Sequence, residues 1–158
     1  PLSNPTANCE AIPEDVVHWT DGQAIIATGS PFEPVTHAGQ RHVIGQGNNA
    51  FVFPAIGFAG ILGRCTRISD AMIIESAFAL AEYTDAHHHA QGLIFPPINE
   101  LREVSEVVAA KVLRVALQDG DSSRTELAEL DDNALNSFIR QRMWQPDYLP
   151  YVLAEDAR

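Results

Sequence analysis

The segment Gly45-Gln46-Gly47-Asn48-Asn49 places two neighbouring carboxamides in a glycine-bracketed turn, directly before an apolar run that begins at Ala50. Glycine can adopt positive φ and lets a ligand approach the backbone, and each asparagine offers one acceptor and two donor hydrogens without net charge. This chemistry suits a carboxylate, a hydroxy acid or a nicotinamide amide. Because Asn and Gly are also common turn and cap residues, the motif alone favours a purely structural role.

Two further junctions change that balance. Residues 1–6 indicate a strand end that runs into a proline-stiffened turn, with an exposed Asn4 where open α/β sheets bind ligands. Residues 24–32 indicate a buried apolar strand that stops at Gly29-Ser30-Pro31. Three strand-to-loop junctions with small polar groups favour a binding site over three unrelated turns.

Other polar groups are interpreted as structural. Consecutive residues on a helix point about 100° apart, so the run His87-His88-His89 cannot all face one ion and is expected to be a solvated helix end or turn. The pairs Glu14-Asp15 and Asp131-Asp132 are typical of helix starts. Cys9 and Cys65 match neither a metal spacing nor a disulfide framework and are expected to be reduced thiols.

Length and charge restrict the class of protein. A chain of 158 residues can fill one domain, and its formal net charge of -11 argues against nucleic-acid or anionic-membrane partners. No apolar run approaches the roughly 20 residues that span a bilayer, and no basic-then-apolar leader precedes the fold. The composition therefore predicts a cytoplasmic protein.

The patterning predicts strand ends, a short helix starting at Pro13 and a hairpin around Gly39 within residues 1–48, followed by helices to about residue 120. Residues 49–62 are apolar nearly all round, as in a buried helix.

Two longer helices and a less regular end are expected to follow. A helix over 70–83, capped by Ser69, is expected to have four apolar residues on one side, namely Met72, Ile73, Ala77 and Leu80. The longest helix should be capped by Asn99 and end at Gly120, with a periodic apolar set of Leu101, Val104, Val108 and Val112. One or two short helices after Asp121 would contain Leu127, Leu130, Leu135, Phe138 and Ile139.

Several segments resemble, in the same order, the C-terminal part of the malic enzymes. They are Leu-Ser-Asn-Pro-Thr at 2 to 6, Trp-Thr-Asp-Gly at 19 to 22, Ala-Thr-Gly-Ser-Pro-Phe at 27 to 32, Gly-Gln-Gly-Asn-Asn-Ala at 45 to 50, Ile-Ser-Asp at 68 to 70, Gln-Gly-Leu-Ile-Phe-Pro-Pro-Ile at 91 to 98 and Arg-Glu-Val-Ser at 102 to 105. The resemblance covers about the first 120 residues, with a trace at 144–148.

The resemblance implies an α/β fold. Residues 1–48 would form the C-terminal part of a Rossmann-like NAD(P)-binding domain, residues 49–122 a predominantly helical segment completing the catalytic core, and residues 123–158 a C-terminal extension. It implies a homo-oligomeric oxidoreductase that converts malate to pyruvate and CO2 with reduction of NAD or NADP. Because the chain opens inside a motif, it is expected to be a fragment.

The resemblance also assigns roles to residues. Asn4 would face the substrate and the nicotinamide ribose, and Asn48 and Asn49 would contact the nicotinamide end of the cofactor and a malate carboxylate. The divalent metal, Mn²⁺ or Mg²⁺, and the catalytic tyrosine and lysine would be bound or supplied by residues outside this chain. Lys111, the only lysine, lies in a patterned helix and does not match that base; a G-x-G-x-x-G loop is also lacking.

Two alternatives remain open at this point. Malolactic enzymes, which produce lactate and CO2, share the paired asparagines; the serine and phenylalanine of the turn at 29–32 favour a malic enzyme instead. The chain could also be a non-catalytic folding or interaction module. On either view we expect the isolated 158 residues to be inactive, and to self-associate or be incompletely ordered near the N-terminus.

Overall fold

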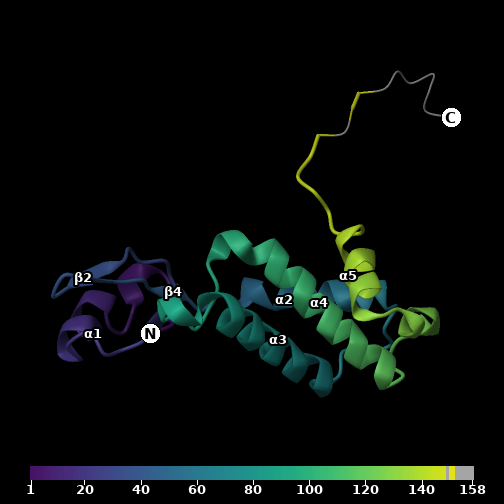
Figure 1. Cartoon of the computed structure of the whole chain (residues 1–158), viewed down its shortest axis with the longest axis horizontal. Coiled ribbons are helices and arrows are strands. Elements are labelled where there is room, and N and C mark those ends of the chain that lie inside the picture. The colour runs from purple at the N-terminus through teal and green to yellow at the C-terminus, as the bar shows by residue number, and fades with distance from the viewer. Residues whose placement is uncertain (149, 152–158) are drawn as a thin grey trace.

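The structure, a computed structural model, describes residues 1–148, 150 and 151. Figure 1 shows two regions along the longest axis of the molecule. One contains the first 48 residues, with the short helix α1 and the hairpin strand β2, and the other contains the helices α2, α3, α4 and α5.

The first region is made of short elements. They are the 3-10 helix η1 (Thr6–Asn8), the helix α1 (Pro13–Trp19) and the strands β1 (Ala27–Thr28), β2 (Val35–His37), β3 (Gln40–His42) and β4 (Gly45–Gln46). Pro13 starts α1 and acidic residues fill its first turn, as predicted. The predicted hairpin is also confirmed: β2 and β3 pair antiparallel, and Gly39 supplies a φ of +81° at the turn.

The second region is helical. Its elements are η2 (Asn49–Phe51), α2 (Phe53–Leu62), α3 (Asp70–His88), η3 (His89–Gln91), η4 (Ile98–Glu100), α4 (Leu101–Gln118), η5 (Thr125–Glu129) and α5 (Asp132–Arg140). Helix α4 is central and packs against α2, α3 and α5. Val104, Val108 and Val112 are fully buried on its inner side, so the predicted periodicity is confirmed.

The residues that begin and end the two long helices were predicted correctly in part. The Ser69 hydroxyl accepts a hydrogen bond from the Met72 N–H and caps α3, as expected, and Gly120 follows α4 with a φ of +74°. Asn99 does not cap α4, because Pro97 is followed by one turn of 3-10 helix that contains Asn99. Nor is α4 the longest helix: α3 has 19 residues against 18, since it continues past Tyr83 to His88.

The predicted burial of apolar side chains was wrong at several places. On α3, Met72 is buried but Ile73 is 50% exposed and Ala77 is exposed, because the inward side follows Met72, Ser76, Ala79 and Tyr83. On α2, Ile61 is 75% exposed although the helix is apolar all round. The strand expected over 24–32 is paired only at 27 and 28. The described part of the chain therefore leaves apolar sides of α2 and α3 uncovered.

The described residues contain no helix that is both long and apolar enough to cross a membrane. Both cysteines are free, as expected. Of the predicted C-terminal extension, residues 149 and 152–158 lie outside the described residues.

Candidate functional site

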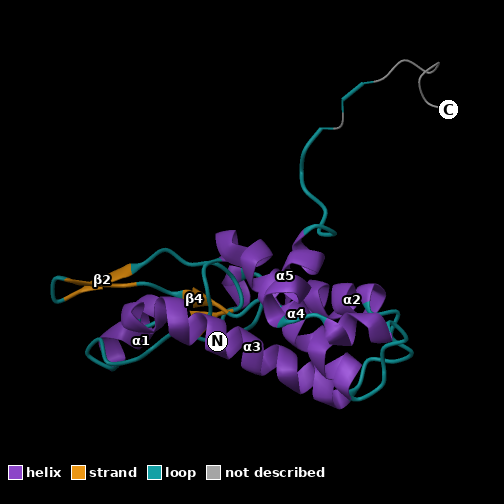
Figure 2. Ribbon diagram, turned by 45° about the vertical axis from the view of Figure 1, so that its right-hand side comes forward, coloured by secondary structure: helices purple, strands orange, loops and turns teal. Residues whose placement is uncertain are grey.

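The site is built from two parallel strands. Ala27 pairs with Gly45 and Thr28 with Gln46, so the carboxyl ends of β1 and β4 meet at one edge. The N–H of Gly47 donates to the Thr28 carbonyl over 2.9 Å and continues the pairing beyond the strands. Figures 1 and 2 both show the N-terminus close to β4. Two of the three predicted junctions are therefore adjacent through their backbones.

The third junction joins them at Gly29. The Gly29 N–H donates to the carbonyl of Pro1 over 3.1 Å, and the Gln46 side-chain amide donates to the Gly29 carbonyl over 3.1 Å. A Cβ atom at Gly29 would lie 2.1 Å from the Leu2 carbonyl oxygen, which no side chain tolerates. Glycine is therefore required here so that the N-terminal segment can lie against the end of β1.

Asn4 is held by a residue that the sequence did not single out as a site residue. The buried Ser30 hydroxyl donates to the Asn4 Oδ1 atom, while the Asn4 side chain as a whole is exposed. Only the Oδ1 atom of the Asn4 side chain is hydrogen-bonded: within the described residues its Nδ2 group donates no hydrogen bond. The Gly-Ser-Pro turn was the available signal for Ser30 in the sequence.

Asn48 and Asn49 play different local parts. The Asn48 Oδ1 atom accepts a hydrogen bond from the Ala50 N–H over 2.9 Å and caps η2. The oxygen of Asn48 therefore has the capping role that asparagine commonly has before a helix. That bond leaves the two Nδ2 hydrogens of Asn48 free to donate. Asn49 is the exposed first residue of η2. All three predicted asparagines thus follow, or are hydrogen-bonded to, the same sheet edge.

The site offers neutral donors. Its asparagine and serine side chains do not titrate, so their hydrogen-bonding capacity is independent of pH in the physiological range. One carboxylate is bonded next to Asn4: the Ser3 hydroxyl donates to Glu10 over 2.6 Å and lowers the pKa of the Glu10 carboxyl. A ligand carboxylate would consequently be oriented here by amide N–H groups.

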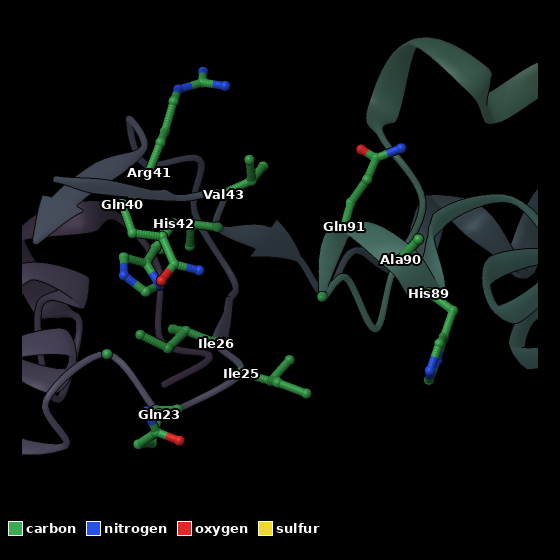
Figure 3. A pocket seen from close by; sticks show the side chains of 14 residues that line it. Gln23, Ile25, Ile26, Gln40, Arg41, His42, Val43, His89, Ala90 and Gln91 are labelled. Atoms are coloured by element: carbon green, nitrogen blue, oxygen red, sulfur yellow. The ribbon is translucent and has the colours of Figure 1, made fainter.

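A cavity of about 340 Å³ lies at the opposite, amino ends of β1 and β4, where Ile26 and Ile44 line it, between the hairpin and the end of α3. Figure 3 shows Gln40, Arg41 and His42 of β3 on one side, and His89 and Gln91 on the other. The three asparagines do not line this cavity. The predicted recognition groups therefore form a surface edge rather than the wall of that cavity.

The histidine run is not solvated as a whole, contrary to the prediction. His87 and His89 are exposed, but His88 is buried and its Nε2 atom lies 2.7 Å from Glu100 Oε2. The reason is the length of α3: residue 88 lies one turn beyond Thr84, on the buried side. Among the residues that the structure describes, no group of three His, Cys, Asp or Glu side chains is arranged to hold a metal ion.

Known proteins match this chain over most of its length. A family model described as malic enzyme, NAD binding domain, matches residues 1–117. The NAD-dependent malic enzymes of Aliivibrio fischeri (strain ATCC 700601 / ES114) and Aliivibrio salmonicida (strain LFI1238) are each 44% identical over 151 residues. Each match covers 96% of this chain and 26% of the relative. The chain therefore spans about a quarter of the length of these relatives.

A solved structure agrees. The crystal structure of the Entamoeba histolytica malic enzyme superimposes with a TM-score of 0.67 at 25% sequence identity, covering 89% of this chain and 25% of that one. The expected α/β, Rossmann-like fold class is confirmed by this likeness and by the family model. On these findings, the chain belongs to the malic enzyme family.

Proposed function

We propose that this chain is part of an NAD-dependent malic enzyme that oxidises malate and decarboxylates it to pyruvate and CO2. The supporting observation is the common sheet edge, where Ser30 orients Asn4 and the Ala50 N–H orients Asn48. The chain's relatives are named NAD-dependent malic enzymes, which favours NAD over NADP. Since the chain spans a quarter of those relatives, the activity belongs to the longer polypeptide.

The three asparagines would divide the recognition between them. Asn4 would donate to the substrate and the nicotinamide ribose, Asn48 to the nicotinamide end of the cofactor, and Asn49 to a malate carboxylate and to the nicotinamide end. The residues fit such ligands because the acceptor oxygens of Asn4 and Asn48 are already engaged, which turns their N–H donors toward a ligand. When bound, NAD supplies the ring that accepts the hydride from C2 of malate.

Neutral donors suit this reaction. Hydride transfer requires the reacting atoms to be held at a near-attack distance, so the chain's contribution is orientation. An amide orients a carboxylate through directed hydrogen bonds, yet it binds the departing CO2 and the product less strongly than an arginine would. The asparagines would thus accelerate the reaction by positioning substrate and cofactor rather than by moving a proton.

The described residues do not fit a divalent metal ion, because they contain no cluster of three suitable ligands. We therefore propose that the Mn²⁺ or Mg²⁺ and the catalytic acid and base are held by other parts of a longer, homo-oligomeric protein. The isolated chain should then produce no NADH from malate and Mn²⁺. Measurable turnover by the purified 158 residues would contradict this division.

The decisive experiment changes Asn49 to alanine in the full protein. Losing one carboxylate donor should raise the malate KM about tenfold and lower kcat about tenfold, roughly 1.4 kcal/mol each. The matched control is Asn133→Ala, an exposed asparagine on α5 remote from the sheet edge. Unchanged steady-state kinetics in Asn49→Ala would count against the proposed role.

The same assay separates the reaction types. A malic enzyme yields pyruvate with net NADH formation, whereas a malolactic enzyme yields lactate. We favour pyruvate because Ser30 and Phe32 are usually replaced in the malolactic enzymes, and Ser30 holds Asn4 in place here. Lactate as the main product would reverse this preference.

A further inference from the structure

The turn that contains Asn48 and Asn49 rests on the loop between α3 and α4. A Cβ atom at Gly47 would lie 3.3 Å from Phe95 Cε2, so the Phe95 ring lies directly against the Gly47 backbone. The same ring stacks on Phe51, which follows the turn in the sequence, at 6.5 Å between centroids. Leu93 approaches Gly45 in β4 in the same way. The loop between α3 and α4 therefore packs against the turn and the strand that carry the candidate site.

The two ends of this loop are tied together. His88, the last residue of α3, places Nε2 2.7 Å from Glu100 Oε2, just before α4 begins. The Tyr83 hydroxyl donates to the same oxygen over 3.0 Å. The His88 side chain is 8% exposed and the Glu100 side chain 25% exposed, so this polar contact is largely shielded from water. A partly desolvated, charge-assisted hydrogen bond of this kind is stronger than an exposed one.

The charge of Glu100 supports this geometry. Burial raises the pKa of the Glu100 carboxyl, but hydrogen bonds from His88 and Tyr83 outweigh it and hold that pKa below its ordinary value. Glu100 is therefore an anion at neutral pH. Between His88 and Glu100 the chain has only short 3-10 turns and irregular backbone, so the tie limits the positions that Phe95 can take.

We propose that His88 is a positioning residue: by bonding Glu100 it closes the α3–α4 loop, seats Phe95 against Gly47 and fixes the turn that presents Asn48 and Asn49. This inference rests on the proposed function for its catalytic consequence, but the seating of the turn can be measured without any turnover. His88 touches neither substrate nor cofactor in this scheme.

The test compares His88→Ala with His88→Gln, both in the full-length protein. Glutamine places its Nε2 donor the same number of bonds from Cα as histidine does, so it can still donate to Glu100. Amide hydrogen exchange over residues 46–51 should be faster by about tenfold or more in His88→Ala and near the wild-type rate in His88→Gln. The matched control is His89→Ala, which removes an exposed neighbour that pairs only with the exposed Asp85.

The second measurement is the steady-state kinetics and the NADH affinity of the same full-length variants. His88→Ala should raise the KM for malate and for NAD and lower kcat, each by up to about tenfold, and the NADH dissociation constant should rise with them; His88→Gln should restore all four. Glu100→Gln should resemble His88→Ala in direction. Phe95→Leu should also speed exchange over 46–51, and combining it with His88→Ala should add little, because both changes act through one contact.

Three results would overturn the inference. The first is an unchanged exchange rate over residues 46–51 in His88→Ala, and the second is an exchange rate in His88→Gln as high as in His88→Ala. The third is exchange that rises uniformly over α2, α3 and α4, which would make His88 merely a core residue. A wild-type protein that does not oxidise malate would instead refute the proposed function, and the exchange measurement would still decide whether His88 seats the turn.

Discussion

The first 48 residues and the helical region that follows are stabilised in different ways. In residues 1–48 the strands are two or three residues long, and the buried apolar side chains are few, chiefly Val17 and Ile26. In the helical region a single core surrounds α4, with Val108 and Leu113 fully buried. Backbone hydrogen bonds between sequence-distant turns hold the first region, and apolar packing holds the second.

The candidate recognition groups and the apolar core therefore lie in different regions of the chain. The candidate recognition groups Asn4 and Asn48 lie on the region with little core, where turns can present amides outward. The contacts of Phe95 with Gly47 and Phe51 connect that region to the helices. A loosely packed edge can thus be held in one conformation by a rigid neighbour.

The largest expected effect is in the helical core. Leu113→Ala removes a side chain with 0% exposure that contacts no solvent, and should lower the free energy of unfolding by about 2–5 kcal/mol. Urea unfolding followed by circular dichroism at the helical band measures it. The control is Ile61→Ala on α2, which is 75% exposed and should change the free energy by less than about 0.5 kcal/mol. Equal losses in the two variants would contradict a core centred on α4.

A matched pair of valines tests whether the two regions unfold separately. Val17 in α1 and Val112 in α4 are both fully buried, so truncating either to alanine should cost about 2 kcal/mol locally. Hydrogen exchange should rise only within residues 1–48 for Val17→Ala, but throughout α2, α3 and α4 for Val112→Ala. Identical, global exchange changes in both variants would show one cooperative unit and remove the contrast.

The parts of the fold that the sequence predicted correctly are those with local causes. Ser69 caps α3, Gly39 turns the hairpin, and the valines of α4 repeat with the helical period. The outward position of Ile73 could not be predicted, since an apolar helix has several sides that suit burial. Which side is buried depends on where α4 packs, and that contact is made between residues far apart in the sequence.

The site shows the same limit. The motifs located three junctions that the structure brings together, but only two of them end strands, since residues 1–5 form no strand. The roles of Asn4, Asn48 and Asn49 in binding stay predictions. Ser30 was missed because its partner Asn4 is 26 residues away. The burial of His88 was missed because its partner Glu100 is 12 residues away, on the other side of the loop between α3 and α4. Side-chain pairs across such separations are fixed by tertiary packing.

The smallest expected effect concerns acid and the boundary between the two regions. The folded pKa of Glu100 is lowered from an ordinary value near 4.5, so its contribution to stability is fully present above that value. It is lost as the pH falls through the lower, folded pKa, because the protonated carboxyl no longer attracts the His88 and Tyr83 donors as an anion. Glu100→Gln should therefore be less stable than wild type by about 1 kcal/mol or less at pH 6.

That deficit should shrink as the pH falls below about 4.5 and through the lower, folded pKa of Glu100, because the wild-type side chain then becomes neutral as well. Urea unfolding of both proteins at several pH values measures the difference directly. Arg124 and Glu126 provide the control, since this ion pair lies at η5, away from the loop between α3 and α4: Arg124→Gln should leave the acid-dependent difference between the wild-type and Glu100→Gln proteins unchanged. A deficit in Glu100→Gln that stayed constant from pH 6 down to the acid limit of the folded state would mean that the Glu100 charge does not tie the loop, and that packing alone joins the two regions.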